Sequence, residues 1–206
     1  MEQSIINFLI SFVLLMVGVT VHEFAHGWVA YKCGDNTAKF SGRLTLNPLA
    51  HVDPLMTFIL PLVLYLSTAG RFVFGAAKPV PVDFSALRNP RRDMVLVGFA
   101  GPAANFILAA LLSVLWKFIP HYQINGYVLE TLISINVILG VFNLIPLPPL
   151  DGSRIVMGLL PPGLAYKYAQ VDRFGFVIII VLLWMGVLDW VIFPAVNWVM
   201  NLLMLI

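Results

Sequence analysis

The sequence predicts an all-α protein that crosses a membrane several times, and two observations lead to this fold class. Hydrophobic residues make up 60% of the 206-residue chain and charged residues only 11%, whereas a soluble domain carries roughly 25% charged residues. Several apolar stretches also reach about 20 residues, the length that a helix needs to cross a hydrocarbon core about 30 Å thick. We expect one membrane-embedded domain, residues 1–206, with a core over about 5–160 and C-terminal membrane helices over 174–206.

Three stretches are long and apolar enough to be spans: Ile5–Tyr31, Met94–Ile119 and Tyr127–Leu147. The first lacks a basic n-region and a small-residue cleavage site, so we expect it to be retained rather than removed as a signal peptide. A fourth stretch, Phe174–Ile206, is long enough for a tilted span and an additional interfacial helix. The expected break in this fourth stretch is at Asp189, Trp190 and Pro194. The prediction is therefore about four transmembrane helices.

Three further segments are expected to be shorter elements. Leu55–Ala69 is apolar but short and contains Pro61, so it is either a short span or a re-entrant, membrane-embedded segment. Residues 38–46 alternate loosely between apolar and polar types, which indicates a short β segment. Residues 77–83 are kept extended by two prolines and can only form an edge strand.

The first span contains the sequence His22-Glu23-Phe24-Ala25-His26. Residues i and i+4 share one face of a helix, so both imidazoles can bind one zinc ion while Glu23 holds a water molecule beside it. Ionisable side chains inside a membrane span are costly, and they usually have a functional reason. The alternative is a polar cluster that only bridges helices.

A catalytic zinc site needs a third protein ligand and one open position. The metzincin extension is excluded, because Val29 and Lys32 stand where that motif has glycine and histidine. Among the acidic residues, Asp151 follows three prolines at the end of a span. Proline stops the helix there and frees backbone polar groups, which is tolerated at membrane depth only beside protein or a cavity. Asp151 is therefore the predicted third ligand, and the alternative is a turn residue before Gly152.

These motifs resemble the site-2 protease family of intramembrane zinc metalloproteases, most closely its small prokaryotic branch without a PDZ domain. The resemblance covers roughly residues 15–160. The matching segments are His22–His26, Arg43–Pro54, Lys78–Val82, Gly101–Asn105 and Asn143–Gly152. The resemblance implies that His22, His26 and Asp151 bind one catalytic zinc ion and that Glu23 is the catalytic base.

The resemblance also implies roles for Asn105 and Asn143 near the substrate or the developing oxyanion. The alternative for either residue is an amide that packs helices together, and Asn105 follows the small residues Gly101, Ala103 and Ala104 that favour such an interface. His51 could approach the zinc, plug the site or bind substrate. Its alternative is a histidine that makes interfacial hydrogen bonds.

A shared metal ion would fix the topology. The first helix and the Tyr127 helix would end on the same side of the membrane and run parallel, with the Met94 helix antiparallel to both. Leu55–Ala69 would then enter and leave on one side, or lie embedded. Of the 12 Lys and Arg residues, all except Lys117 would lie on the active-site side. Because cytoplasmic loops carry the positive charge, we expect a multi-pass protein of the cytoplasmic membrane whose active site opens toward the cytoplasm.

The expected function is that of a zinc-dependent endopeptidase that hydrolyses peptide bonds in or near transmembrane segments of membrane proteins. Its partners would be a transmembrane protein substrate and membrane lipid, with no nucleic acid, and the sequence leaves the oligomeric state open. The alternative is a non-proteolytic metal-binding membrane protein. Glu23 argues against it, because a purely structural site gains nothing from a water-activating carboxylate. A cation transporter would need ionisable groups in the other half of the membrane, where the chain has almost none.

Overall fold

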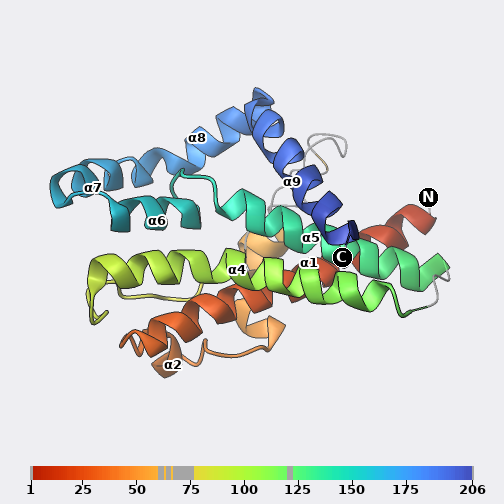
Figure 1. Cartoon of the computed structure of the whole chain (residues 1–206), viewed down its shortest axis with the longest axis horizontal. Helices are drawn as coiled ribbons and strands as arrows, with labels where there is room; N and C mark the ends of the chain where they lie inside the picture. Colours follow the sequence, from red (N-terminus) through yellow and green to blue (C-terminus); the bar gives the residue numbers. More distant parts are fainter. Residues whose placement is uncertain (1, 60–62, 64–65, 67–76, 120–122, 206) are drawn as a thin grey trace.

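The computed structural model describes every residue except 1, 60–62, 64–65, 67–76, 120–122 and 206 (Figure 1). The described part is helical and contains no β-strand. Its helices are α1 (Glu2–Lys32), α2 (Thr37–Phe40), η1 (Pro48–His51), η2 (Pro54–Ile59), α4 (Pro90–Trp116), α5 (Gln123–Asn143), α6 (Asp151–Leu159), α7 (Pro162–Ala169), α8 (Asp172–Trp184) and α9 (Val187–Leu205).

Three helices are long and apolar enough to cross a membrane, namely α1, α4 and α5. Helices α8 and α9 meet at an angle of 80° and would count as a fourth crossing if the bent pair is one span. The bend falls at Gly186, whose φ of 70° is in the left-handed region that favours glycine. The expected break at Asp189, Trp190 and Pro194 was therefore wrong, because all three residues lie inside α9.

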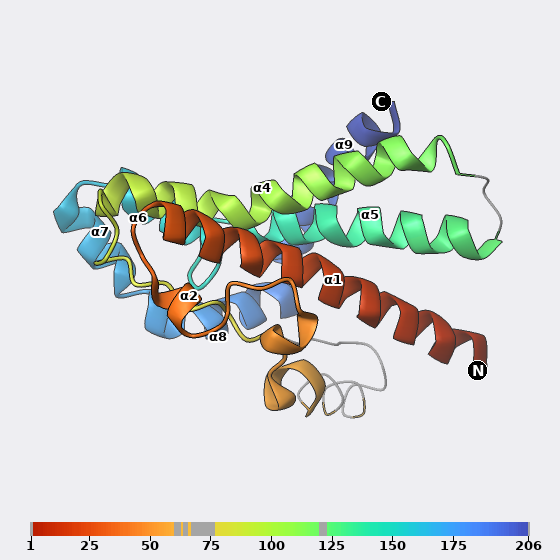
Figure 2. The same cartoon turned by 90° about the horizontal axis from the view of Figure 1, so that it is seen from below.

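The three long helices form one bundle. Figures 1 and 2 show that α1 and α5 run in the same direction and that α4 runs antiparallel to both, as predicted. Helix α6 lies beside the first half of α4, and α9 crosses α5 near the C-terminus. Buried apolar side chains of α4, α5 and α9 pack together at this crossing, among them Ala109, Ile133, Val137 and Val196.

Small residues bring α6 against α4. A Cβ on Gly98 would lie 3.1 Å from the backbone oxygen of Asp151, and a Cβ on Gly158 would lie 2.6 Å from the backbone oxygen of Arg91. Glycine at these positions lets the two backbones approach closely, as at other membrane helix interfaces. Because α6 begins at Asp151, this contact places its carboxylate over the middle of the bundle.

The two predicted β segments were wrong. Residues 37–40 form the helical turn α2, closed by a hydrogen bond of 2.9 Å from Phe40 N to Asn36 O, and turns and bends follow it. Residues 77–83 have no regular secondary structure, and they pair with no strand in the described part of the chain. Their prolines remove two ladder donors, and carboxylates rather than a neighbouring strand take the N–H groups of Val80 and Asp83.

Two other boundaries bear on the prediction. Helix α5 ends at Asn143 rather than at Leu147, because Pro146 disfavours the helical conformation for the residue before it. The predicted re-entrant segment Leu55–Ala69 begins as the short helix η2, but its residues 60–62, 64–65 and 67–69 lie outside the described residues. Whether this segment crosses the membrane stays a prediction.

Candidate metal centre

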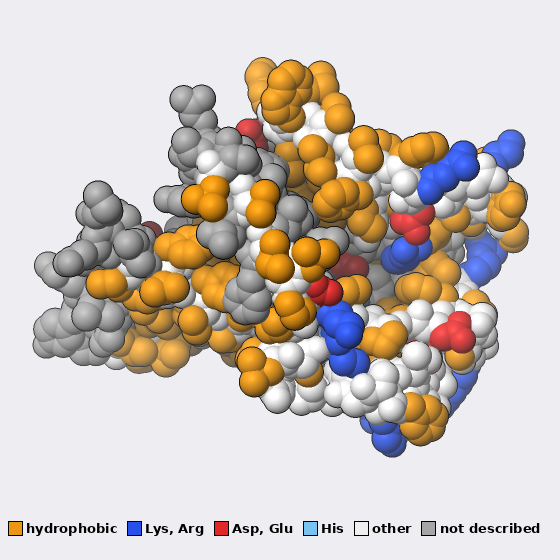
Figure 3. Space-filling view, turned by 180° about the vertical axis from the view of Figure 1, so that it is seen from behind, with side chains coloured by type: hydrophobic (Ala, Val, Ile, Leu, Met, Phe, Trp, Pro, Cys, Tyr) orange, Lys and Arg blue, Asp and Glu red, His pale blue; other side chains and the backbone are white. Residues whose placement is uncertain are grey.

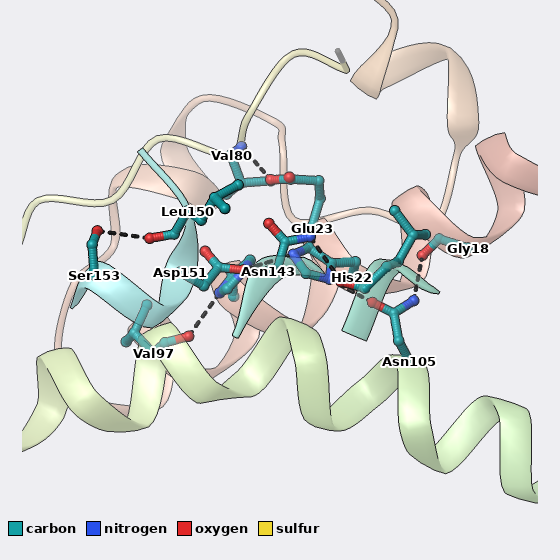
Figure 4. Close-up of polar contacts among 12 residues, drawn as sticks. Gly18, His22, Glu23, Val80, Val97, Asn105, Asn143, Leu150, Asp151 and Ser153 are labelled. Atoms are coloured by element: carbon teal, nitrogen blue, oxygen red, sulfur yellow. Dashed lines mark hydrogen bonds and ion pairs between the residues drawn. The ribbon is translucent and has the colours of Figure 1, made fainter. Parts of the chain in front are cut away.

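Three side chains converge at the centre of the bundle (Figure 4). His22 and His26 lie one turn apart on α1, and Asp151 is the first residue of α6. The two Nε2 atoms are 3.0 Å apart. Oδ2 of Asp151 lies 3.0 Å from Nε2 of His22 and 3.1 Å from Nε2 of His26. The i, i+4 spacing and the broken end of α5 thus bring together the three residues that the sequence indicated.

The hydrogen bonds behind the two imidazoles fix which nitrogen faces the centre. His22 Nδ1 donates to Oδ1 of Asn105 at 2.5 Å, and His26 Nδ1 donates to the backbone oxygen of Val97 at 2.7 Å. Both partners are acceptors, so each Nδ1 carries a hydrogen, and the neutral form of each ring presents its Nε2 lone pair to the centre. Two imidazole lone pairs and one carboxylate oxygen therefore point at the same small volume.

This donor set fits zinc. A tetrahedral zinc site with ligand distances of about 2.0–2.1 Å has edges of about 3.3–3.4 Å, close to the observed separations of 3.0–3.1 Å. Gly101 on α4 faces the same volume, and a Cβ there would overlap the Nε2 atoms of both histidines. The absence of a side chain at this position leaves room for an ion.

The turn from α5 to α6 sets the position of Asp151. A Cβ on Gly152 would overlap the backbone oxygen of Leu144, so this chain segment folds back on itself as only glycine allows. The hydroxyl of Ser153 donates to Leu150 O at 2.7 Å and closes the first turn of α6. Burial raises the pKa of the Asp151 carboxyl, but protonated imidazoles hold it below its ordinary value through the charge of His26 and hydrogen bonds from both rings. A cation between the three groups would act on the carboxyl in the same direction, so the carboxylate is the form expected as a ligand.

Glu23 lies next to His22 on α1 and is half-buried. Its Oε2 accepts the backbone N–H of Val80 at 2.7 Å, a contact that Figure 4 shows beside the three converging side chains. The carboxylate is thus placed at the edge of the centre without being part of the cluster of possible ligands. Sequence reasoning found Glu23 from its motif but missed the Val80 donor.

The structure places Asn105 behind His22. Its Oδ1 accepts from His22, and its Nδ2 donates to Gly18 O at 3.2 Å and to Oδ1 of Asn136 at 2.7 Å. Both amide hydrogens are therefore engaged within the bundle and the amide oxygen holds the His22 imidazole, while the predicted role of Asn105 near the substrate stays a prediction. Asn136 is fully buried and was missed by sequence reasoning, although a lone amide inside an apolar span is a signal that could have found it.

The other two predicted site residues lie differently. Asn143 is near Asp151 in Figure 4, and its Nδ2 donates one hydrogen to Leu139 O at 3.0 Å. The second hydrogen has no partner among the described residues and is available to a ligand. His51 is fully buried, its Nε2 donates to Thr45 O at 3.0 Å, and it does not belong to the converging cluster. The predicted substrate roles of Asn143 and His51 stay predictions.

The model of Peptidase family M50 matches residues 10–126 and 123–185. The chain belongs to peptidase family M50. It is 41% identical to "Putative zinc metalloprotease YwhC" of Bacillus subtilis, with 90% of this chain and 84% of that protein covered. It is 32% identical to "Putative zinc metalloprotease Rip2" of Mycolicibacterium smegmatis, with coverage of 91% and 73%. No solved structure matches the chain significantly.

A third relative is more distant and longer. "Zinc metalloprotease MJ0392" of Methanocaldococcus jannaschii is 30% identical over 76% of this chain but only 36% of that protein. The family and the apolar helices together make this M50 peptidase a multi-pass membrane protein.

The substitution Gly101→Ala tests the space between the imidazoles. The added methyl group would overlap both Nε2 atoms, so we expect zinc content to fall from about one ion per chain to a small fraction of that. Gly126→Ala is the matched control, because a Cβ there meets only Trp116 at an ordinary 3.7 Å. Elemental analysis of the purified proteins measures both, and full zinc occupancy in Gly101→Ala would contradict this placement of the ion.

The substitution Asn105→Ala tests the orientation of His22. Loss of the acceptor at Nδ1 should weaken zinc binding about 10–100-fold, measured by competition with a chromophoric chelator. Ser113→Ala is the control on the same helix, because Ser113 is also buried but donates only to its own helix at Ala109 O. Equal zinc affinities in the two variants would show that Asn105 does not orient the ligand.

Proposed function

We propose that this M50 peptidase is a zinc-dependent intramembrane endopeptidase that hydrolyses peptide bonds in or near the transmembrane segments of membrane proteins. The observation that carries the proposal is the convergence of His22, His26 and Asp151 within 3.1 Å of one another, between helices long enough to span a membrane. The adjacent carboxylate of Glu23 completes the set of groups that metal-assisted hydrolysis needs. The family and the names of its relatives support the same activity.

In this proposal His22, His26 and Asp151 hold the zinc ion. When bound, zinc supplies Lewis acidity, which polarises a carbonyl oxygen and lets water lose a proton near neutral pH. Glu23 accepts the proton of the attacking water on its carboxylate and later delivers it to the amine that leaves. Val80 holds one carboxylate oxygen of Glu23, which leaves the other oxygen for this proton transfer.

Asn143 is the residue best placed to contact the substrate. Its side chain lies near Asp151, and its second amide hydrogen could donate to the scissile carbonyl or to the oxygen that develops negative charge. A helical substrate hides its carbonyl groups in i→i−4 hydrogen bonds, so it must unwind locally before attack. The proposed substrate is therefore a transmembrane segment that unwinds readily at the cleavage position.

We further propose that the protein lies in the cytoplasmic membrane with its active site open to the cytoplasm. Lys and Arg side chains gather at one end of the face drawn in Figure 3. This end carries the first turn of α4 and the helices α6 and α7, while Lys117 follows the opposite end of α4. The excess of positive charge on cytoplasmic loops supports this orientation.

Glu23→Gln tests the proposed chemistry. The amide cannot accept the water proton, so we expect the rate of cleavage to fall about 10²–10⁴-fold while zinc content stays unchanged. The assay incubates purified protein in detergent or liposomes with a panel of single-span membrane proteins, and product is followed by mass spectrometry. Glu130→Gln is the control, because Glu130 is exposed on α5.

A chelator should abolish the same cleavage, and added zinc should restore it. Two outcomes would contradict the proposal: Glu23→Gln cleaving at the wild-type rate, or zinc-loaded wild-type protein cleaving no member of the panel. The second outcome would favour a non-proteolytic metal-binding protein.

A further inference from the structure

A backbone donor outside α1 holds the Glu23 carboxylate. This donor is the N–H of Val80, 2.7 Å from Oε2, and it belongs to the irregular residues 78–83, here called the clamp segment (Figure 4). Pro79 and Pro81 have no N–H group. Val80 is therefore the one backbone donor of this tripeptide, and Glu23 takes it.

The side chain of Val80 also fixes the position of the clamp segment along α1. It is only 7% exposed, and its Cγ1 lies 3.1 Å from the position that a Cβ on Gly27 would occupy. Gly27 lies one turn beyond Glu23 on the same helix. Pro81 also restricts Val80 to an extended backbone. Backbone and side chain of Val80 thus contact two successive turns of α1.

Hydrogen bonds hold both ends of the clamp segment. At its start, Lys78 N–H donates to His51 O at 2.9 Å, and Nη2 of Arg43 donates to Lys78 O at 2.6 Å. At its end, Asp83 N–H donates to Oδ2 of Asp35 at 2.8 Å. Of these three hydrogen bonds, only the one from Asp83 has a buried carboxylate as its acceptor.

Asp35 is 0% exposed and follows the end of α1 closely in sequence. Its Oδ1 accepts the N–H of Thr37 at 2.8 Å and the Thr37 hydroxyl at 2.5 Å. With the Asp83 contact, the buried carboxylate has three donors, which compensate its desolvation. Asp35 therefore ties the clamp segment to the end of the helix that carries Glu23.

We propose that Asp35 is a positioning residue for peptide hydrolysis: it holds Asp83 against the end of α1 and so keeps the Val80 N–H on the Glu23 carboxylate. The inference rests on the proposed role of Glu23 as the base. Without the tether, the end of the clamp segment loses its hydrogen bond at the end of α1, so the Val80 N–H holds the Glu23 side chain less firmly in one rotamer. Displacement of a reacting group by about 1 Å lowers a rate about 100-fold.

Hydrogen exchange tests the tether without using activity. In Asp35→Asn the two donors of Thr37 keep the amide oxygen, so the NH₂ group faces the N–H of Asp83 and cannot accept from it. We expect faster deuterium uptake at the amides of Val80 and Asp83 in the zinc-loaded protein. Asp83→Asn is the matched control: its side chain accepts hydrogen bonds from the following turn, chiefly from Ser85, and its own N–H still reaches Asp35.

The same measurement tests the contact with Glu23. Glu23→Ala removes the acceptor, so uptake at the Val80 amide should rise, whereas Glu23→Gln keeps an acceptor oxygen and should leave it unchanged. Wild-type uptake at Val80 in both Asp35→Asn and Glu23→Ala would overturn the proposal. This arm remains decisive even if the wild-type protein cleaves no substrate, an outcome that would overturn only the proposed function.

Kinetics separate positioning from folding. With a single-span peptide that the wild type cleaves, we expect Asp35→Asn to lower kcat about 10–100-fold and to change KM by less than about twofold. Zinc content should equal that of the wild type and of Asp83→Asn. Unchanged kcat would overturn the proposal, and so would parallel loss of zinc and activity, because it would make Asp35 a support of the metal centre itself.

Discussion

Two imidazole lone pairs and a carboxylate oxygen lie within 3.1 Å of one another inside a bundle of apolar helices, and the rest of the structure depends on this contact. Three electron-rich atoms at such distances repel one another unless a cation or a proton lies between them. Burial strengthens this repulsion, because little water is present to screen the charges. The arrangement therefore fits a cation-binding site, in which a bound ion would link α1 to α6.

The surrounding residues keep these three atoms facing one another despite their repulsion. Val97 and Asn105 take the outer hydrogens of the two imidazoles, so that neither ring can turn its lone pair away. Gly101 leaves the central space open, and the close packing of α6 on α4 brings Asp151 to it. Glu23 is held by a separate segment of the chain, so the contact that positions the proposed base is distinct from the contacts of the three proposed ligands.

The converging residues could be predicted from sequence because each had a local signal. The spacing of His22 and His26 puts them on one helix face, and the prolines before Asp151 mark a broken helix end. Three other features of the site could not be predicted from the sequence, because they depend on contacts between distant segments. They are the Val80 donor, the space at Gly101 and the Asn105–Asn136 hydrogen bond. The β prediction failed for a related reason: two N–H groups of residues 77–83 donate to the carboxylates of Glu23 on α1 and Asp35 just after it, and not to a neighbouring strand.

Zinc X-ray absorption spectroscopy on Asp151→Cys tests the central contact most directly. The wild type has one cysteine, Cys33, and we predict that its zinc has only nitrogen and oxygen neighbours. The variant, loaded with zinc, should gain one sulfur neighbour at about 2.3 Å. A zinc-loaded variant without this sulfur would show that residue 151 is not a ligand and would contradict the account.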